Sequence, residues 1–279
     1  MTFHEQFHLP HYFSGKIRAQ IEHLYGSVAI GNLAQAIITL FEPIFLYFVV
    51  GLSVTEVLGF MAAVYALYAL LIGYGAKIAS RYGYSRSILI SVPFQVAYWF
   101  LILSSENQIL MLIPAVLFFA LQKTFYWPAI HASMAKYADR QQLGREFSLM
   151  YAIMNLMQII GPMLGGFLSV MFGIKAVFVI ASLIYFCSVI PLFWSKESHS
   201  RKPYRFHDTF ALYKKYPTRF LGFWGFGEEL LVLTIWPIFI FMILKNYQDI
   251  GSLVTVATLV ATGLGLYIGF YTDKHSKES

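Results

Sequence analysis

The chain has 279 residues, of which 58% are hydrophobic and 12% are charged. Soluble globular domains carry about 25% charged residues, and a water-soluble fold of this size could not cover so much apolar surface. The net charge is +6, but the basic residues lie in short segments between long apolar runs rather than in one patch, which argues against a nucleic-acid partner. The composition therefore predicts an integral protein of a lipid bilayer.

Eight apolar runs are each long enough to cross a membrane as a helix, which takes about 20 mostly apolar residues. They cover residues 25–50, 54–79, 85–103, 108–134, 146–171, 174–194, 219–244 and 250–271. Residues 1–24 are polar to amphipathic and form an N-terminal segment rather than a cleavable signal. Because helices satisfy their own backbone groups in lipid, the sequence predicts an all-α, polytopic transmembrane bundle.

Lysine and arginine are distributed unequally between the loops of this bundle. With the N-terminus placed inside, 17 of the 20 basic residues fall in cytoplasmic segments, and Lys175 and Lys245 fall outside. This bias predicts that both termini are cytoplasmic, in the cytoplasmic (plasma) membrane. The basic stretch 195–218 is predicted to be a cytoplasmic linker between a six-helix unit at 25–194 and two further helices at 219–279. Part of this linker, residues 206–213, is a candidate for the membrane surface.

The chain also contains a candidate internal repeat, a common feature of membrane transporters. A shift of 193 residues aligns the start of the first predicted helix, near Tyr25, with the start of the seventh, near Thr218. The same shift places the loop 80–83 on residues 273–276. The alignment rests on hydropathy and loop chemistry rather than on residue identity.

The loop after the second predicted helix combines a glycine with basic residues. Gly83 permits a tight turn with positive φ, and Arg81 and Arg86 suit a cytoplasmic boundary. The segment resembles the loop between helices 2 and 3 of the major facilitator superfamily, in which Arg81 and Gly83 match the family pattern. Ser80 stands where the family has an aspartate, and Ala76 where it has a glycine. The missing acid puts the family's charge-relay gate in doubt for this half.

A second copy of the loop follows the eighth predicted helix. There Gly269, Asp273 and Lys274 keep the glycine, the acid and the base. The superfamily has twelve helices in two six-helix halves, so the resemblance implies a first half plus helices 7 and 8, ending in a cytoplasmic loop. The expectation is therefore a truncated reading frame or a fragment. An incomplete chain without transport activity, inserted in the membrane as a helical protein only, is the alternative to a working carrier.

The fifth predicted helix carries a cluster of small residues, Gly161, Pro162, Gly165 and Gly166. Small residues let helices approach closely, and proline bends a helix where its neighbours can satisfy the freed backbone group. The cluster resembles the motif on helix 5 of the superfamily's proton-coupled exporters. A general packing seam between helices is the alternative.

Polar residues recur at steps of three and four on several predicted helices and so share one face of each. They are Asn32, Gln35 and Glu42 on the first, Lys123 and Trp127 on the fourth, Asn155 and Gln158 on the fifth, and the adjacent Glu228 and Glu229 on the seventh. Charges inside a membrane usually face a cavity or a partner. In the superfamily, helices 1, 4 and 7 line the central cavity, so the resemblance implies a substrate or proton-coupling role. Hydrogen bonding between helices without a ligand is the alternative.

Depth along the predicted helices suggests how these charges are arranged. At 1.5 Å per residue, Lys123, Glu228 and Glu229 each lie about 22–24 Å below the outer helix end, and Glu42 lies about 12 Å below it. We therefore expect Lys123 to pair with Glu228 or Glu229, and Glu42 to form a separate site nearer the outside.

These observations predict a secondary transporter that moves a small-molecule substrate. The resemblance of the fifth helix to proton-coupled exporters favours, but does not fix, protons as the coupling ion and export as the direction. No catalytic cluster, nucleophile elbow or phosphate loop occurs in the sequence, so an enzyme is not expected. No cofactor and no metal site are expected either. The partners predicted from the sequence are thus the solute, protons and the lipid bilayer.

Overall fold

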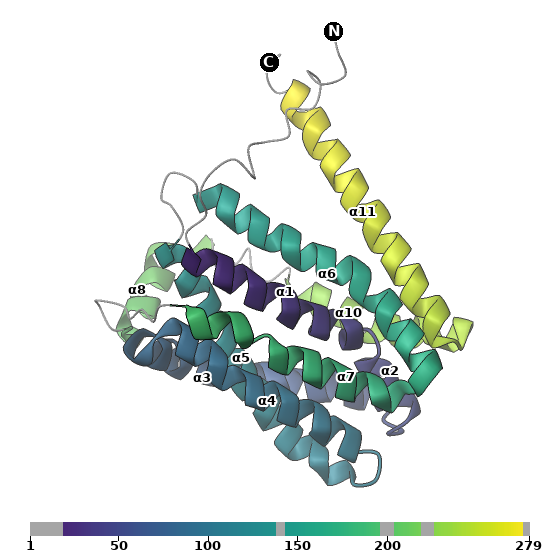
Figure 1. Cartoon of the computed structure of the whole chain (residues 1–279). Coiled ribbons are helices and arrows are strands. Elements are labelled where there is room, and N and C mark those ends of the chain that lie inside the picture. The colour runs from purple at the N-terminus through teal and green to yellow at the C-terminus, as the bar shows by residue number, and fades with distance from the viewer. Residues whose placement is uncertain (1–18, 138–142, 196–203, 219–225, 276–279) are drawn as a thin grey trace.

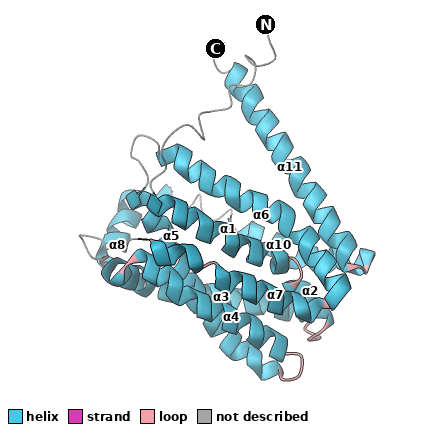
Figure 2. Cartoon of the chain, viewed as in Figure 1, coloured by secondary structure: helices cyan, strands magenta, loops and turns pink. Residues whose placement is uncertain are grey.

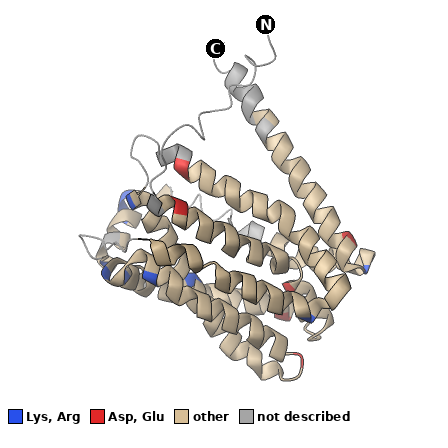
Figure 3. Cartoon of the chain, in the orientation of Figure 1, with Lys and Arg blue, Asp and Glu red and all other residues tan. Residues whose placement is uncertain are grey.

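The computed structural model describes residues 19–137, 143–195, 204–218 and 226–275. Within these ranges the chain consists of helices joined by turns and short loops, and contains no strand (Figure 2). Charged residues gather at the two ends of the bundle, and long stretches of uncharged residues lie between them (Figure 3). The predicted all-α transmembrane bundle is confirmed.

Six helical segments of the described chain are long and apolar enough to cross a membrane. The spans are Ile21–Phe48, Val54–Tyr82, Tyr84–Ser104, Ile109–Tyr137, Glu146–Phe172 and Ile174–Trp194. They are built from the helices α1 (Ala19–Thr39), α2 (Glu42–Phe48), α3 (Val54–Tyr82), α4 (Tyr84–Ser104), η2 (Ile109–Met111), α5 (Leu112–Tyr137), α6 (Leu143–Phe172), α7 (Ile174–Cys187) and η3 (Ile190–Trp194), of which α1 and α6 begin two and three residues before their spans. These segments match the first six predicted crossings.

The seventh and eighth predicted crossings correspond to α10 (Phe226–Leu244) and α11 (Tyr247–His275). Helices α3 and α11 begin at Val54 and Tyr247. These two first residues are 193 positions apart (247 minus 54), the shift of the predicted repeat. The predicted loop from residue 273 onward is wrong up to His275, because α11 stays helical beyond its apolar run. Helix α3 does the same, continuing through Arg81 to Tyr82.

The first crossing is broken, although a single helix over 25–50 was predicted. Leu40 and Phe41 separate α1 from α2. Pro43 stands at the start of α2, and because it has no N–H it cannot donate to the carbonyl four residues earlier, so the α1 helix cannot continue through it. The Phe45 N–H then donates to the Phe41 carbonyl over 2.8 Å and begins the new helix. The break leaves Glu42 as the first residue of α2.

The small-residue cluster lies where α6 touches two neighbours, α1 and α11 (Figure 1). A Cβ atom at Gly161 or Gly165 would collide with α1, and one at Gly166 would lie against the Tyr247 carbonyl at the start of α11. Gly251 on α11 faces the α6 backbone in the same way. From this contact α11 runs away from the rest of the bundle (Figure 1).

The predicted linker contains a helix, α8 (Phe206–Lys215), which packs against the end of α3. The Tyr204 N–H donates to Ser80 Oγ over 3.3 Å. The Phe206 ring occupies the space left by the missing side chain of Gly73 and contacts Tyr74 edge-on, with ring centroids 5.3 Å apart. The linker is therefore attached to the first unit by specific contacts.

Candidate functional site

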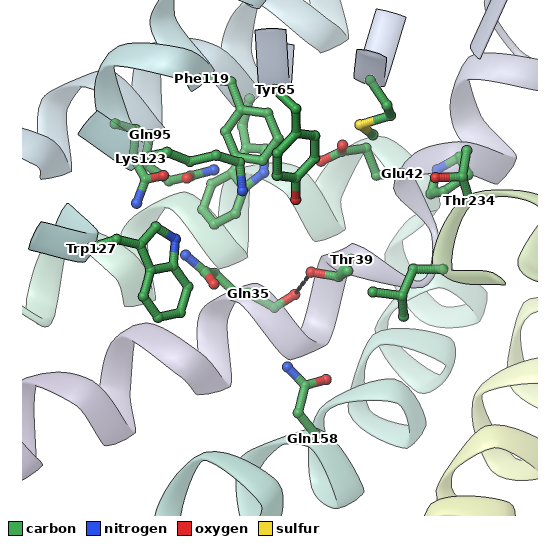
Figure 4. Close-up of a pocket in the computed structure, with 15 residues that line it drawn as sticks. Gln35, Thr39, Glu42, Tyr65, Gln95, Phe119, Lys123, Trp127, Gln158 and Thr234 are labelled. Carbon is green, nitrogen blue, oxygen red and sulfur yellow. Dashed lines mark hydrogen bonds between the residues drawn. The ribbon is translucent and has the colours of Figure 1, made fainter. Parts of the chain in front are cut away.

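A pocket of about 190 Å³ lies where α1 to α6 and α10 meet (Figure 4). Its polar lining consists of Gln35, Thr39, Glu42, Gln95, Gln122, Lys123, Gln158 and Thr234, and its aromatic lining of Tyr65, Trp99, Phe119 and Trp127. The residues come from both sides of the linker, since Thr234 belongs to α10 and the others to α1–α6. A small pocket that brings several polar side chains together inside an apolar bundle is a usual form of a solute site.

A second cavity of about 950 Å³ shares Tyr65, Lys123 and Trp127 with this pocket. Its lining extends to Tyr204 and Thr209, next to and within α8. Because the two cavities share lining residues, a continuous wall leads from the polar pocket to the end of the bundle that carries the linker.

Glu42 is a buried acid in the wall of the pocket. Its side chain is 5% exposed, and the Tyr98 hydroxyl donates to its Oε1 over 2.6 Å. The Trp99 side chain provides a second hydrogen bond. Burying a carboxyl is costly unless hydrogen bonds or an opposite charge compensate it, and these adjacent α4 side chains supply the hydrogen bonds.

Lys123 supplies the opposite charge. Its Nζ lies 4.2 Å from the centre of the Phe119 ring and 4.9 Å from that of Tyr65, which are distances of cation–π attraction. The charges of Lys123 and Glu42 also interact across the pocket. In Figure 4 the Lys123 amine lies beside Tyr65, with Glu42 on the other side of that ring.

The expected separation of Glu42 from Lys123 is therefore wrong, since both line one pocket. The depth count assumed straight, untilted helices, whereas the first crossing is broken next to Glu42. The expected pairing of Lys123 with Glu228 or Glu229 lies outside the described residues, because only the backbone of these two is described.

Four glutamines line the pocket, of which Gln95 is the most unusual. Gln122 donates to the Tyr185 hydroxyl over 3.0 Å, and Gln35 bonds the same hydroxyl. Gln95 is 1% exposed, and its Oε1 accepts no hydrogen bond within the described part of the chain. An orphaned buried acceptor is rare, because leaving one unsatisfied costs about 1–3 kcal/mol. Its position in the lining makes it a candidate contact for a ligand.

Sequence reasoning missed Gln95, Gln122, Tyr65 and Phe119. Gln95 stands alone in an apolar run and belongs to no polar stripe. Pro93, two residues before it, was the available signal, because a proline in a membrane helix often marks irregular backbone near a cavity. Tyr65 and Phe119 could not be recognised as pocket residues from the sequence, because 18% of the chain is aromatic.

Two predicted cavity residues lie elsewhere. Asn32 is buried, donates to the Val28 carbonyl over 2.8 Å and bonds Tyr126, so it links α1 to α5. Asn155 is exposed on α6, outside the lining of the two cavities described above. By contrast Gln158, one turn further along α6, lines the pocket.

The first predicted gating loop is a one-residue connection between α3 and α4. Gly83 has a φ of +117°, a value that disfavours any residue with a side chain. The guanidinium of Arg81 lies 5.4 Å from the centre of the Tyr82 ring, and Arg86 is exposed on α4. The side chains of the second copy, Gly269, Asp273 and Lys274, lie outside the described residues.

Comparison with known families gives one assignment. The family model for the Major Facilitator Superfamily matches residues 24–279, which is nearly the whole chain. No curated protein matches the chain. The match begins within α1 and covers all the later helices to α11.

Proposed function

Since the chain belongs to the major facilitator superfamily, we propose that it is a secondary active transporter in which the solute binds the pocket around Glu42 and Lys123. Members of this family are integral membrane transporters rather than enzymes, and they act on small molecules. The observation that carries the proposal is a buried acid and a half-buried base that line one pocket of an otherwise apolar bundle. Such groups are costly in a membrane and are kept where they serve transport.

Proton coupling is the mechanism that this arrangement supports. Glu42 is hydrogen-bonded by Tyr98 and faces the charge of Lys123, so a solute that changes the charge balance of the pocket also changes the preferred protonation state of the carboxyl. A carboxyl that meets each side of the membrane in turn can then carry a proton against the movement of the solute. The resemblance of the cluster Gly161 to Gly166 to that of proton-coupled exporters supports export as the direction.

Replacing Glu42 with glutamine tests this proposal. The amide keeps the shape and the ability to accept from Tyr98 but cannot exchange a proton at neutral pH. In proteoliposomes that enclose a pH-sensitive dye, we expect solute-driven proton movement, screened over a panel of small solutes, to fall by at least about tenfold in Glu42→Gln. Glu106→Gln, outside the pocket, is the control. Proton movement at the unmodified rate in Glu42→Gln would contradict the role of Glu42.

We also propose the arrangement of the chain around this pocket. Residues 25–194 form one six-helix unit, residues 195–218 a cytoplasmic linker, and residues 219–279 the start of a second unit, with both termini in the cytoplasm. The one-residue turn at Gly83 and the 193-residue offset between the starts of α3 and α11 support a repeated gate that contains Arg81, Arg86, Gly269, Asp273 and Lys274.

A further inference from the structure

We propose that the pocket binds a zwitterionic solute of the amino-acid type, in which an ammonium and a carboxylate stand next to an apolar or aromatic group. This inference rests on the proposed function and specifies its substrate class. It is carried by three features of the pocket: its balanced pair of charges, the unsatisfied oxygen of Gln95, and the aromatic wall that continues into the larger cavity.

The pair of charges favours a solute with no net charge. Glu42 and Lys123 line the same small pocket and their charges interact. A solute with a single charge would neutralise one of them and leave the other uncompensated in a region of low dielectric, which is strongly unfavourable. A zwitterion places its ammonium near Glu42 and its carboxylate near Lys123, so every charge has a partner. The carboxylate of Glu42 can accept further hydrogen bonds besides those from Tyr98 and Trp99.

Gln95 is an independent indication that the ligand carries a hydrogen-bond donor. Its side chain is 1% exposed and its Oε1 has no partner within the described residues, although it lines the pocket. Only a donor can satisfy this oxygen. An ammonium has three donors, enough to serve both Gln95 and Glu42, whereas a carboxylate has none. A simple organic anion therefore leaves this acceptor unsatisfied.

The walls beside the charges are suited to an apolar or aromatic group. The rings of Phe119 and Tyr65 lie against Lys123, and Trp127 lines both cavities. Beyond them lies the cavity of about 950 Å³, which borders α8. A solute with its charged head in the polar pocket can thus extend its side group along the aromatic wall toward the linker.

Three related probes test the inference on the 279-residue chain in nanodiscs. They are L-phenylalanine, 3-phenylpropionate, which lacks the ammonium, and phenethylamine, which lacks the carboxylate. Binding of tritiated L-phenylalanine is measured by scintillation proximity, and the two analogues are added as competitors. Because each analogue loses charged hydrogen bonds and leaves a pocket charge unpaired, we expect each to compete at least about tenfold more weakly than unlabelled L-phenylalanine.

Three variants test which pocket residue contacts which group of the solute. In each variant the measured quantity is how strongly an analogue competes relative to unlabelled L-phenylalanine, so a general loss of binding does not affect the result. In Glu42→Gln, 3-phenylpropionate should compete nearly as well as L-phenylalanine. In Lys123→Met, phenethylamine should compete nearly as well as L-phenylalanine. Gln95→Leu should weaken the two amines and spare 3-phenylpropionate. Glu106→Gln and Lys175→Met remove the same charges from an ion pair outside the pocket and should leave all ratios unchanged. The comparison of the three probes on the unmodified chain tests the substrate class by itself, even if a variant does not fold.

The outcomes separate this inference from the proposed function. If either singly charged analogue competes as well as L-phenylalanine, or if tritiated L-phenylalanine does not bind, the zwitterion inference is overturned. Solute-driven proton movement with another compound would then still support a transporter. If L-phenylalanine binds with the expected ratios but no solute moves protons, the substrate class stands and proton coupling fails.

Discussion

At the scale of single residues, the hydrogen bond between Tyr98 and Glu42 is the contact whose loss is easiest to interpret. Tyr98→Phe removes only the hydroxyl that donates to the buried carboxylate over 2.6 Å. We expect the variant to lose about 1–3 kcal/mol of stability, because a buried charged acceptor loses a partner. Thermal unfolding in detergent, followed by circular dichroism, measures this loss. Tyr82→Phe removes an exposed hydroxyl and should leave the midpoint unchanged; equal midpoints for Tyr98→Phe and the unmodified chain would refute the expectation.

The residues of the site were predictable to different degrees. Glu42 and Lys123 were visible from the sequence because a charge inside an apolar run is costly and therefore informative. Their location in one pocket was not, since it depends on the break before Glu42 and on how the helices cross. Gln95 was not visible at all, because a neutral amide is common in membrane helices and only its unsatisfied oxygen distinguishes it.

At the scale of helices, the contact of α6 with α1 depends on the absence of side chains. A Cβ atom at Gly165 would collide with the Ile37 carbonyl and the Phe41 ring, so Gly165→Leu must push the two helices apart. We expect this variant to lose at least about 1–3 kcal/mol of stability or to fail to fold, as for overpacked cores. The yield of monodisperse protein in size-exclusion chromatography, together with the unfolding midpoint, checks this result.

Gly59 provides the matched control for this substitution. It lies within α3 with open space where its Cβ would be, so Gly59→Leu adds the same side chain without a collision. Since glycine is unfavourable inside a helix, Gly59→Leu should be neutral or slightly stabilising. If Gly59→Leu and Gly165→Leu had the same effect, close packing would not explain the motif on α6.

Helix positions were more predictable than helix interruptions. Long apolar runs located the six spans closely, because the thickness of the bilayer fixes the length of a crossing helix. The break at Leu40 and Phe41 was not predicted, although Pro43 follows it in the sequence. Many membrane helices tolerate a proline, so Pro43 alone does not indicate a break. Helix α8 was missed as a helix because it depends on contacts such as that of Phe206 with Gly73, which no local pattern reveals.

At the scale of the whole molecule, the proposed orientation has a direct test. Cys187 is the one cysteine of the chain, so a Cys187→Ser background accepts single reporter cysteines. Asn107→Cys lies in the turn before η2, which should face outside, and Lys214→Cys lies on α8, which should face the cytoplasm. In intact cells, a membrane-impermeant maleimide should label Asn107→Cys and spare Lys214→Cys. Labelling of both after permeabilisation is the control, and the opposite pattern in intact cells would reverse the topology.

The contact between α6 and α11 also affects how easily the two proposed units can move. Where side chains interlock, one helix can slide past another only if rotamers change, and this resists motion. At Gly166 and Gly251 the two helices meet backbone against backbone, so a small rotation displaces no side chain there. The Thr255 hydroxyl, which donates to the Ile159 carbonyl over 2.8 Å, stays close to this contact and can act as the pivot. Close contact between the two backbones therefore opposes a small rotation of α11 against α6 less than interlocked side chains would.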